Sequence, residues 1–133
     1  MKREIKCQGW NGTKLCEVRQ IHFDADLKTL FWFPRKGYPN KFYQDCEEYP
    51  LRWFTGLHDK NGKDVYEGDK LLFRSEEDES LDRILVVKWD NLLCGWSLYD
   101  DVSDEEAFEP FSDVIGEYFE VIGNIYENPE LLK

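Results

Sequence analysis

Residues 59–64 have the composition of a calcium-binding loop, because two aspartates and an asparagine stand close together in the run Asp-Lys-Asn-Gly-Lys-Asp. A calcium loop of the EF-hand kind needs glycine at its sixth position and a bidentate glutamate at its twelfth. Counted from Asp59, glycine is the fourth residue and Lys70 is the twelfth. Asn61-Gly62 is instead a dipeptide typical of a tight β-hairpin turn. We therefore predict a structural turn here, with no metal or other cofactor.

The two histidines of the chain, His22 and His58, do not form a metal-ligand spacing such as H-x-x-x-H with a nearby carboxylate or cysteine. A general base also needs a partner, and the sequence shows none for either histidine. The chain contains no G-x-x-x-x-G-K-[ST], G-x-S-x-G or H-E-x-x-H motif. We therefore expect no catalytic residue and no enzymatic activity.

Acidic residues are concentrated in the later part of the chain. Residues 1–54 hold 10 Lys and Arg against 7 Asp and Glu, a net charge of +3, whereas residues 55–133 have a net charge of −14. Nucleic acid is held largely through its phosphates, so the acidic part is an unfavourable surface for it. We predict two tightly joined lobes, a net-positive, aromatic-rich β lobe at 1–54 and an acidic lobe at 55–133.

The net-positive part has a group of aromatic and basic side chains that we regard as a possible interaction surface. Its members are Trp10, Phe31, Trp32, Phe33, Arg35 and Lys36. In a strand, the Trp32 side chain points to the opposite face from those of Phe31 and Phe33, so one aromatic face is exposed to solvent unless another surface packs on it. A barrel core or a second copy of the chain would provide that cover. The alternative is a platform that stacks single-stranded bases, aided by Lys14, Arg19 and Lys28.

A second possible interaction surface is the acidic run Glu76, Glu77, Asp78 and Glu79, and a similar run follows at residues 104–106. Runs of like charge are usually solvated loops that keep a protein soluble. They would also suit a basic site on a partner protein. Both interpretations remain open from the sequence.

Many short apolar runs separated by turn residues predict an all-β fold of one or two small barrels, with at most short helical turns. We expect the acidic lobe to be SH3-like, because Gly68-Asp69 leads into an apolar strand. Asn61, Gly62, Gly68 and Asp69 form the predicted structural turn motif. Strands are predicted at residues 3–10, 13–23, 27–33, 41–44, 51–54, 70–74, 83–89, 95–99 and 120–126.

No apolar run approaches the roughly 20 residues that a transmembrane helix needs, and no signal-peptide core follows the charged N-terminus. We therefore expect a soluble protein of the cytosol of the producing cell, in which the four scattered cysteines stay reduced.

Three segments resemble the signature segments of one family. Residues 1–6 with Trp10 resemble its opening R-E-I-K followed by tryptophan, and residues 55–69 resemble T-G-L-x-D-K-N-G-x-x-[IV]-Y-E-G-D. Residues 121–132, VIGNIYENPELL, are similar to its ending. The chain is identified on these segments as a member of the YopX family of bacteriophage and prophage proteins. The resemblance implies a β-barrel fold with an SH3-like lobe and a phage or prophage origin, and it implies no established activity.

Our leading functional hypothesis is a non-enzymatic phage accessory protein that acts by protein–protein contact, as a homo-oligomer whose oppositely charged parts pack head to tail. One alternative is a single-stranded nucleic-acid-binding protein that uses the N-terminal aromatic and basic residues. Another is an acidic inhibitor or mimic that occupies a basic site on a host or phage protein. We expect no contact with a membrane.

Overall fold

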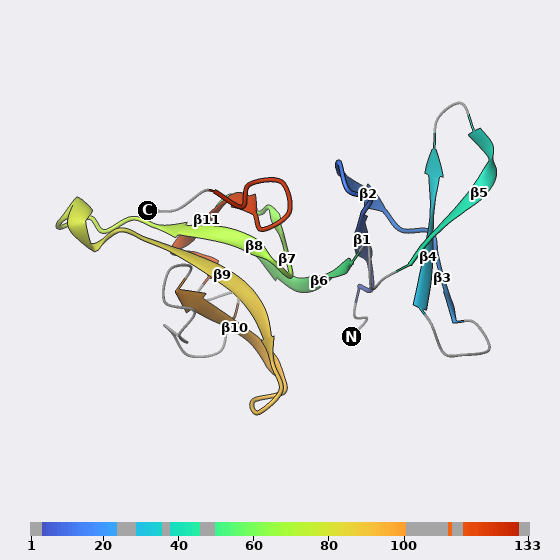
Figure 1. Ribbon diagram of the computed structural model, residues 1–133. Helices are drawn as coiled ribbons and strands as arrows, with labels where there is room; N and C mark the ends of the chain where they lie inside the picture. Colours follow the sequence, from blue (N-terminus) through green and yellow to red (C-terminus); the bar gives the residue numbers. More distant parts are fainter. Residues whose placement is uncertain are drawn as a thin grey trace. The chain divides into compact units, whose positions relative to one another are not determined.

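Turn residues divide the chain into short strands. The computed structural model describes residues 4–23, 29–35, 38–45, 50–100, 112 and 116–130, and at 20, 22, 23, 29–35 and 38–45 it describes the backbone alone. The described residues form one 3-10 helix, η1 (Glu79–Leu81), and eleven strands (Figure 1). The strands are β1 (Cys7–Trp10), β2 (Leu15–Glu17), β3 (Gln20–Phe23), β4 (Thr29–Arg35), β5 (Tyr38–Asp45), β6 (Leu51–His58), β7 (Asp64–Tyr66), β8 (Asp69–Phe73), β9 (Arg83–Asp90), β10 (Gly95–Asp100) and β11 (Phe119–Asn124).

The chain divides into two compact units, residues 2–53 and residues 54–133. Strand β6 contributes to both, since its first three residues pair with β1 and its later residues pair with β7. The boundary falls where the charge of the sequence changes sign. The first unit has a net charge of +3 and the second has a net charge of −14.

In the first unit, Asn11-Gly12 turns the chain between β1 and β2. The Oδ1 atom of Asn11 accepts hydrogen bonds from the backbone N–H groups of Thr13 and Lys14, each at 2.9 Å. Gly12 has a φ of 90°, a conformation that glycine adopts at little cost. Strands β3, β4 and β5 form an antiparallel sheet in the same unit.

The strand predicted at residues 13–23 is two strands in the structure. Strand β2 pairs with β1, whereas β3 pairs with β4, so the chain leaves one partner for another between Glu17 and Gln20. In this gap the N–H of Val18 donates to the carbonyl oxygen of Cys7 at 3.2 Å. The alternating pattern was continuous across the change of partner, and it therefore gave no sign of the break.

Pro34 does not end β4, contrary to the prediction, but lies inside it. Proline has no N–H to donate to a neighbouring strand and is tolerated in strands at bulges. The pairing of β4 with β5 shifts register between Phe33 and Arg35, which accommodates the proline. Strand β5 consequently begins at Tyr38, before the predicted start at residue 41.

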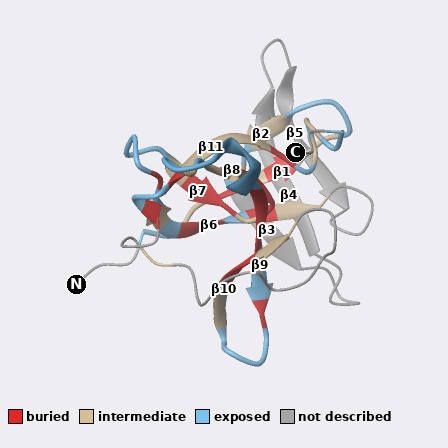
Figure 2. Ribbon diagram, turned by 90° about the vertical axis from the view of Figure 1, so that its left-hand side faces the viewer, coloured by how far each residue is buried: buried red, intermediate tan, exposed pale blue. Residues whose placement is uncertain are grey.

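In the second unit, four antiparallel strands form a sheet in the order β10-β9-β8-β11. The sheet is curved, and the β6–β7 hairpin belongs to the same unit (Figure 1). Leu71 of β8 pairs with Leu85 of β9, and Val87 of β9 pairs with Leu98 of β10. These four side chains form a buried cluster with Val65 of β7 and Phe119 of β11. Figure 2 colours the buried residues of the strands red.

The prediction of an all-β fold is confirmed. The curled sheet of the second unit resembles half of a barrel, and in the described residues β10 and β11 form its two edges. The SH3-like character of this unit stays a prediction. A helical hydrogen bond at 2.8 Å joins the N–H of Gly116 to the carbonyl oxygen of Ser112.

Candidate interaction surface

Asp59 organises the turn between β6 and β7. Its side chain is buried, and its Oδ1 atom accepts hydrogen bonds from the backbone N–H groups of Asn61 at 2.8 Å and Lys63 at 2.9 Å. Its Oδ2 atom accepts a third, from the N–H of Val121 in β11, at 3.0 Å. Hydrogen bonds to an ionised group are stronger than neutral ones. One carboxylate thus shapes the turn and fastens it to a strand 62 residues later.

A backbone contact next to Asp59 reinforces this attachment. The N–H of Lys60 donates to the carbonyl oxygen of Phe119 at 2.9 Å, and the Lys60 ammonium lies 3.7 Å from the Glu120 carboxylate. The ion pair is partly exposed and contributes little. The backbone bond therefore supplies most of the attachment at this point.

The Gly68-Asp69 turn is attached to the other end of β11. The N–H of Gly68 donates to the carbonyl oxygen of Val87 at 2.8 Å, and its own carbonyl accepts from Ile125 at 2.9 Å. Gly68 has a φ of +81°, and a Cβ there would lie 3.1 Å from Cγ1 of Ile125. The Oδ2 atom of buried Asp69 accepts from the N–H of Tyr66 at 2.8 Å.

The C-terminal segment is also held by hydrogen bonds between a side-chain oxygen and backbone N–H groups. The Oδ1 atom of Asn124 accepts from the N–H groups of Tyr126 at 3.0 Å and Glu127 at 2.8 Å. Buried Lys70 donates from Nζ to the carbonyl oxygen of Pro129 at 3.3 Å. We call the contacts of Asp59, Lys60 and Gly68 with Phe119, Val121 and Ile125 the β11 junction. The predicted turn residues Asn61, Gly62, Gly68 and Asp69 lie in or beside this junction.

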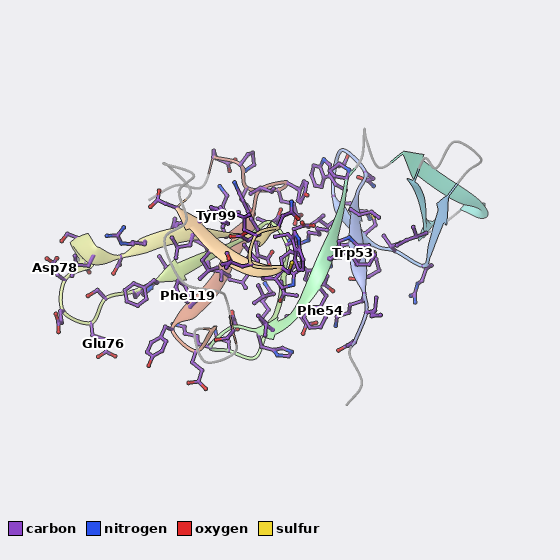
Figure 3. All side chains as sticks on the ribbon, turned by 90° about the horizontal axis from the view of Figure 1, so that it is seen from below. Trp53, Phe54, Glu76, Asp78, Tyr99 and Phe119 are labelled. Atoms are coloured by element: carbon purple, nitrogen blue, oxygen red, sulfur yellow. The ribbon has the colours of Figure 1, made fainter. Side chains whose placement is uncertain are left out.

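The acidic loop, defined as Glu76, Glu77, Asp78 and Glu79, is exposed between β8 and β9. Figure 3 shows Glu76 and Asp78 extending away from the sheet. The Oγ atom of Ser75 accepts hydrogen bonds from the N–H groups of Glu77 at 3.2 Å and Asp78 at 3.3 Å. The N–H of Ser75 donates to Oδ1 of Asp82 at 2.7 Å. The carboxylates are thus displayed on a backbone that its own hydrogen bonds hold in shape.

Asp78 caps η1 within this loop. Its Oδ1 atom accepts from the N–H of Ser80 at 2.9 Å. This backbone hydrogen bond, with a smaller contribution from the Ser80 side chain, lowers the pKa of Asp78 below its usual value of 3.8. Asp82 and desolvation oppose the shift. The carboxylate therefore keeps its charge to lower pH than an ordinary aspartate.

The tip of the β9–β10 hairpin exposes apolar side chains. Leu92 is 95% exposed, Leu93 is 51% exposed and Trp89 is 44% exposed. Cys94, in the same turn, is exposed and free. Figure 2 shows the loop between β9 and β10 as an exposed end of the hairpin. We call Trp89, Leu92, Leu93 and Cys94 the apolar tip.

The apolar tip was not among the residues singled out from the sequence. The sequence predicts only the strands on either side of it, at residues 83–89 and 95–99, and the structure has them at Arg83–Asp90 and Gly95–Asp100. The signal that could have found it is the pair Leu92-Leu93 between turn-forming residues and Gly95. Leucines at a hairpin turn have few neighbours to bury them, so they are expected to be exposed or covered by a partner.

The predicted N-terminal surface is placed only in part. Trp10 ends β1 and is partly buried, and its backbone N–H donates to the carbonyl oxygen of Pro50 at 3.0 Å. Phe31, Trp32, Phe33 and Arg35 lie in β4, whose side chains are outside the description, and Lys36 lies outside the described residues. Their role as a core, an oligomer interface or a stacking platform stays a prediction.

Three of the four cysteines lie in the described residues: Cys7 is buried, Cys16 is partly buried and Cys94 is exposed. Burial raises the pKa of the Cys16 thiol, against the opposing charge of Lys14. Within the described ranges, no three His, Cys, Asp or Glu side chains gather as a metal site. Nor does that part of the chain contain a helix long and apolar enough to span a membrane.

The sequence profile of the family described as YopX protein matches residues 9–133. The chain belongs to the YopX family. Two solved structures are similar to it, each with a TM-score of 0.65. Protein EF1440 from Enterococcus faecalis is 21% identical, and the match covers 99% of this chain and all of that one. Protein yopX from Bacillus subtilis is 19% identical, and the match covers 96% of this chain and 95% of that one.

None of the curated proteins compared with the chain matches it. At these identities the two structures show a shared YopX fold and nothing about activity. In the β11 junction, residues 59–68 of the central segment are hydrogen-bonded to the backbone of Phe119, Val121 and Ile125. These bonds tie the central segment to the C-terminal segment.

Proposed function

We propose that this YopX protein is a phage or prophage accessory protein that acts through protein–protein contact, without catalysis, as a homo-oligomer in the cytoplasm of its bacterial host. The observation that carries the proposal is the charge of the two compact units. Residues 2–53 have a net charge of +3 and residues 54–133 have a net charge of −14. Opposite charges on separate units favour head-to-tail association of copies.

The polar residues of the second unit support a binding role over a chemical one. Asp59, Asp69 and Asn124 use their side-chain oxygens to accept backbone hydrogen bonds. His58 and Asp64 lie 3.3 Å apart, but both are partly exposed on the β6–β7 hairpin. A pair of this kind in the open lacks the buried setting that usually tunes groups for acid–base work.

Light scattering across a salt series tests head-to-tail assembly. At about 0.05 M salt the units attract each other over a longer range than at about 1 M, where the Debye length falls to about 3 Å. We expect larger assemblies at low salt and smaller ones at high salt. A variant with Glu76, Glu77 and Glu79 changed to Gln and Asp78 changed to Asn should assemble less well at low salt. A monomer at both salt concentrations would contradict the proposal.

A second candidate function is the occupation of a basic site on a host or phage protein by the acidic loop. The observation that favours it is the order of this loop, in which Ser75, Asp78 and Asp82 hold the backbone by hydrogen bonds. A loop that is ordered before binding loses less entropy on binding. Pull-down from host lysate, with wild type and the neutralised variant side by side, tests it. A set of partners that is the same for both proteins would contradict this function.

A further inference from the structure

Strand β11 lies at an edge of the sheet in the second unit. In the order β10-β9-β8-β11 it pairs with β8 on one side, and among the described residues no further strand pairs with its other side (Figure 1). An edge strand presents backbone N–H and C=O groups with which a strand of another chain can pair. The outer backbone groups of β11 are therefore a place where another chain could attach.

The β6–β7 turn occupies two of these outer groups. The carbonyl oxygen of Phe119 accepts from the N–H of Lys60 at 2.9 Å, and the N–H of Val121 donates to Oδ2 of Asp59 at 3.0 Å. Backbone groups alternate between the two sides of a strand, so residues two apart present theirs on the same side. Both bonds go to the turn and not to β8. The turn thus supplies the donor and the acceptor that an antiparallel strand would supply at this point.

The other end of β11 is covered by the segment that follows it. The N–H of Asn124 donates to Oδ1 of Asn128 at 3.3 Å, and the N–H of Asn128 donates to the carbonyl oxygen of Asn124 at 3.0 Å. A Cβ at Gly123 would lie 2.6 Å from the same Oδ1 atom, so Asn128 packs directly on the strand. Between the two ends, the pairing with β8 shifts register between Val121 and Gly123. Irregularities of this kind also make an edge a poorer template for another strand.

We propose that Asp59 and Lys60 form an edge guard, which prevents strands of other chains from adding to β11. Asp59 is 6% exposed, so the guard is packed into the fold and is not a loosely attached loop. The partner that it excludes is an extended strand of another protein chain. A second copy of this chain is included once salt has screened the repulsion between the acidic units. The inference goes beyond head-to-tail assembly, because it concerns backbone pairing at one strand and not the charge of the units.

An edge-open variant, Asp59→Asn with Lys60→Pro, removes the guard and keeps the turn. The asparagine oxygen still accepts within the turn, while the amide presents N–H groups to the Val121 N–H. The proline has no N–H to donate to Phe119. The carbonyl oxygen of Asp59 accepts from the N–H of Gly62 at 3.0 Å, so Lys60 is the second residue of a β-turn, a position that favours proline.

The matched control is Lys63→Gln with Asp64→Asn. Like the edge-open variant, it removes one ammonium and one carboxylate from the β6–β7 turn, so both variants keep the net charge of the wild type. The control retains Asp59 and Lys60 and therefore the edge guard. Circular dichroism should show both variants folded. Lys60→Pro alone, which keeps the Asp59 carboxylate, should act in the same direction as the edge-open variant with a smaller effect.

Self-association at high salt tests the guard. Sedimentation velocity of the full chain is measured over a concentration series at about 1 M sodium chloride, where the Debye length is about 3 Å and repulsion between the acidic units is screened. We expect the sedimentation coefficient of the edge-open variant to rise with concentration, because its β11 edge is free to pair. The control should match the wild type at every concentration.

Two further measurements locate the association at β11. In dilute samples, the Val121 N–H should exchange with solvent about tenfold faster or more in the edge-open variant than in the control, because its acceptor is gone. Adding Val121→Pro to the edge-open variant removes the N–H that an incoming strand would need, so the association should be lost. Proline is tolerated in edge strands where the N–H points outward.

Three results would overturn the edge guard. They are an edge-open variant that associates no more than the control, an association that survives Val121→Pro, and a Val121 N–H that exchanges equally fast in both variants. Assembly of the wild type at low salt bears only on the head-to-tail contact. Either proposal can therefore fail while the other stands.

Discussion

Asp59 and Asp90 each accept two backbone hydrogen bonds inside a hairpin turn, yet their hairpins end in different surroundings. The second oxygen of Asp59 binds the N–H of Val121, so the β6–β7 turn is fastened to β11. The second oxygen of Asp90 accepts a hydrogen bond from the Tyr99 hydroxyl of its own hairpin at 3.4 Å, so the β9–β10 turn gains no such attachment there. The same turn chemistry thus yields a buried junction in one place and a free apolar tip in the other. The two turns differ in the donor to the second carboxylate oxygen, which is the Val121 N–H of β11 for Asp59 and the Tyr99 hydroxyl of the same hairpin for Asp90.

The largest effect is expected from Asp59→Ala. It removes the acceptor of three backbone N–H groups, of which that of Val121 lies inside strand β11. We expect the free energy of unfolding to fall by about 2–4 kcal/mol, measured by urea denaturation. Asp59→Asn should lose less, because its oxygen can still accept in the turn while its amide faces the Val121 N–H.

A matched change at Asp64 controls for charge near the same turn. Asp64 is partly exposed and pairs with His58, so Asp64→Asn should change the free energy of unfolding by less than about 0.5 kcal/mol. Equal losses for Asp59→Ala and Asp64→Asn would contradict the role given to the β11 junction.

A smaller loss is expected from Gly68→Ala, which tests the other end of the junction. The variant pays for a positive φ and also brings its Cβ to 3.1 Å from Ile125. Gly56→Ala is the control, because Gly56 has a φ of +83° and nothing within 4 Å of an added Cβ. We expect losses of about 2–3 kcal/mol for Gly68→Ala and about 1 kcal/mol for Gly56→Ala in thermal or urea unfolding. If both variants lost the same free energy of unfolding, the close approach of Gly68 to Ile125 would not contribute to stability.

Much of the fold was predictable from the sequence because strands and turns are specified locally. Alternating runs predicted most of the strands, Gly62 and Gly68 predicted turns, and the structure gives both glycines a positive φ. The choice of strand partner is not local. For this reason the break after Glu17 and the passage of β4 through Pro34 were missed, since both depend on which strand lies alongside.

The surfaces were predictable to a different degree. Exposure of the acidic loop follows from its charge, but its order depends on a hydrogen bond from the Ser75 N–H to Asp82 that sequence patterns do not reveal. The exposure of Leu92 depends on where β8 begins relative to the β9–β10 turn, which is a matter of register between strands. The hydrogen bond between Asp59 and Val121 joins residues far apart in the chain. The residue types at the two positions do not predict that they meet.

Asp90→Ala is expected to have a milder effect than Asp59→Ala, and the difference between them measures the value of attachment to β11. The variant loses two hydrogen bonds from Leu92 and Leu93, which are exposed residues, together with a long contact to Tyr99. We expect a loss of about 1 kcal/mol in urea denaturation. A loss as large as that for Asp59→Ala would mean that the second oxygen does not set the two turns apart.

Asp78 extends the comparison to a third turn, in which the aspartate is fully exposed and the expected effect is the smallest. Its pKa is lowered by the hydrogen bond from the Ser80 N–H, then by the Ser80 side chain. A lowered pKa in the folded state means that the stabilisation is present above the usual value of 3.8 and is lost as the pH falls through the lower, folded value. A carbon-13 NMR titration of the Asp78 carboxyl should therefore give a midpoint below 3.8. Ser80→Ala keeps the backbone N–H and should return the midpoint only part of the way. A wild-type midpoint at the ordinary value would show that this turn, unlike those of Asp59 and Asp90, is not held by its aspartate in solution.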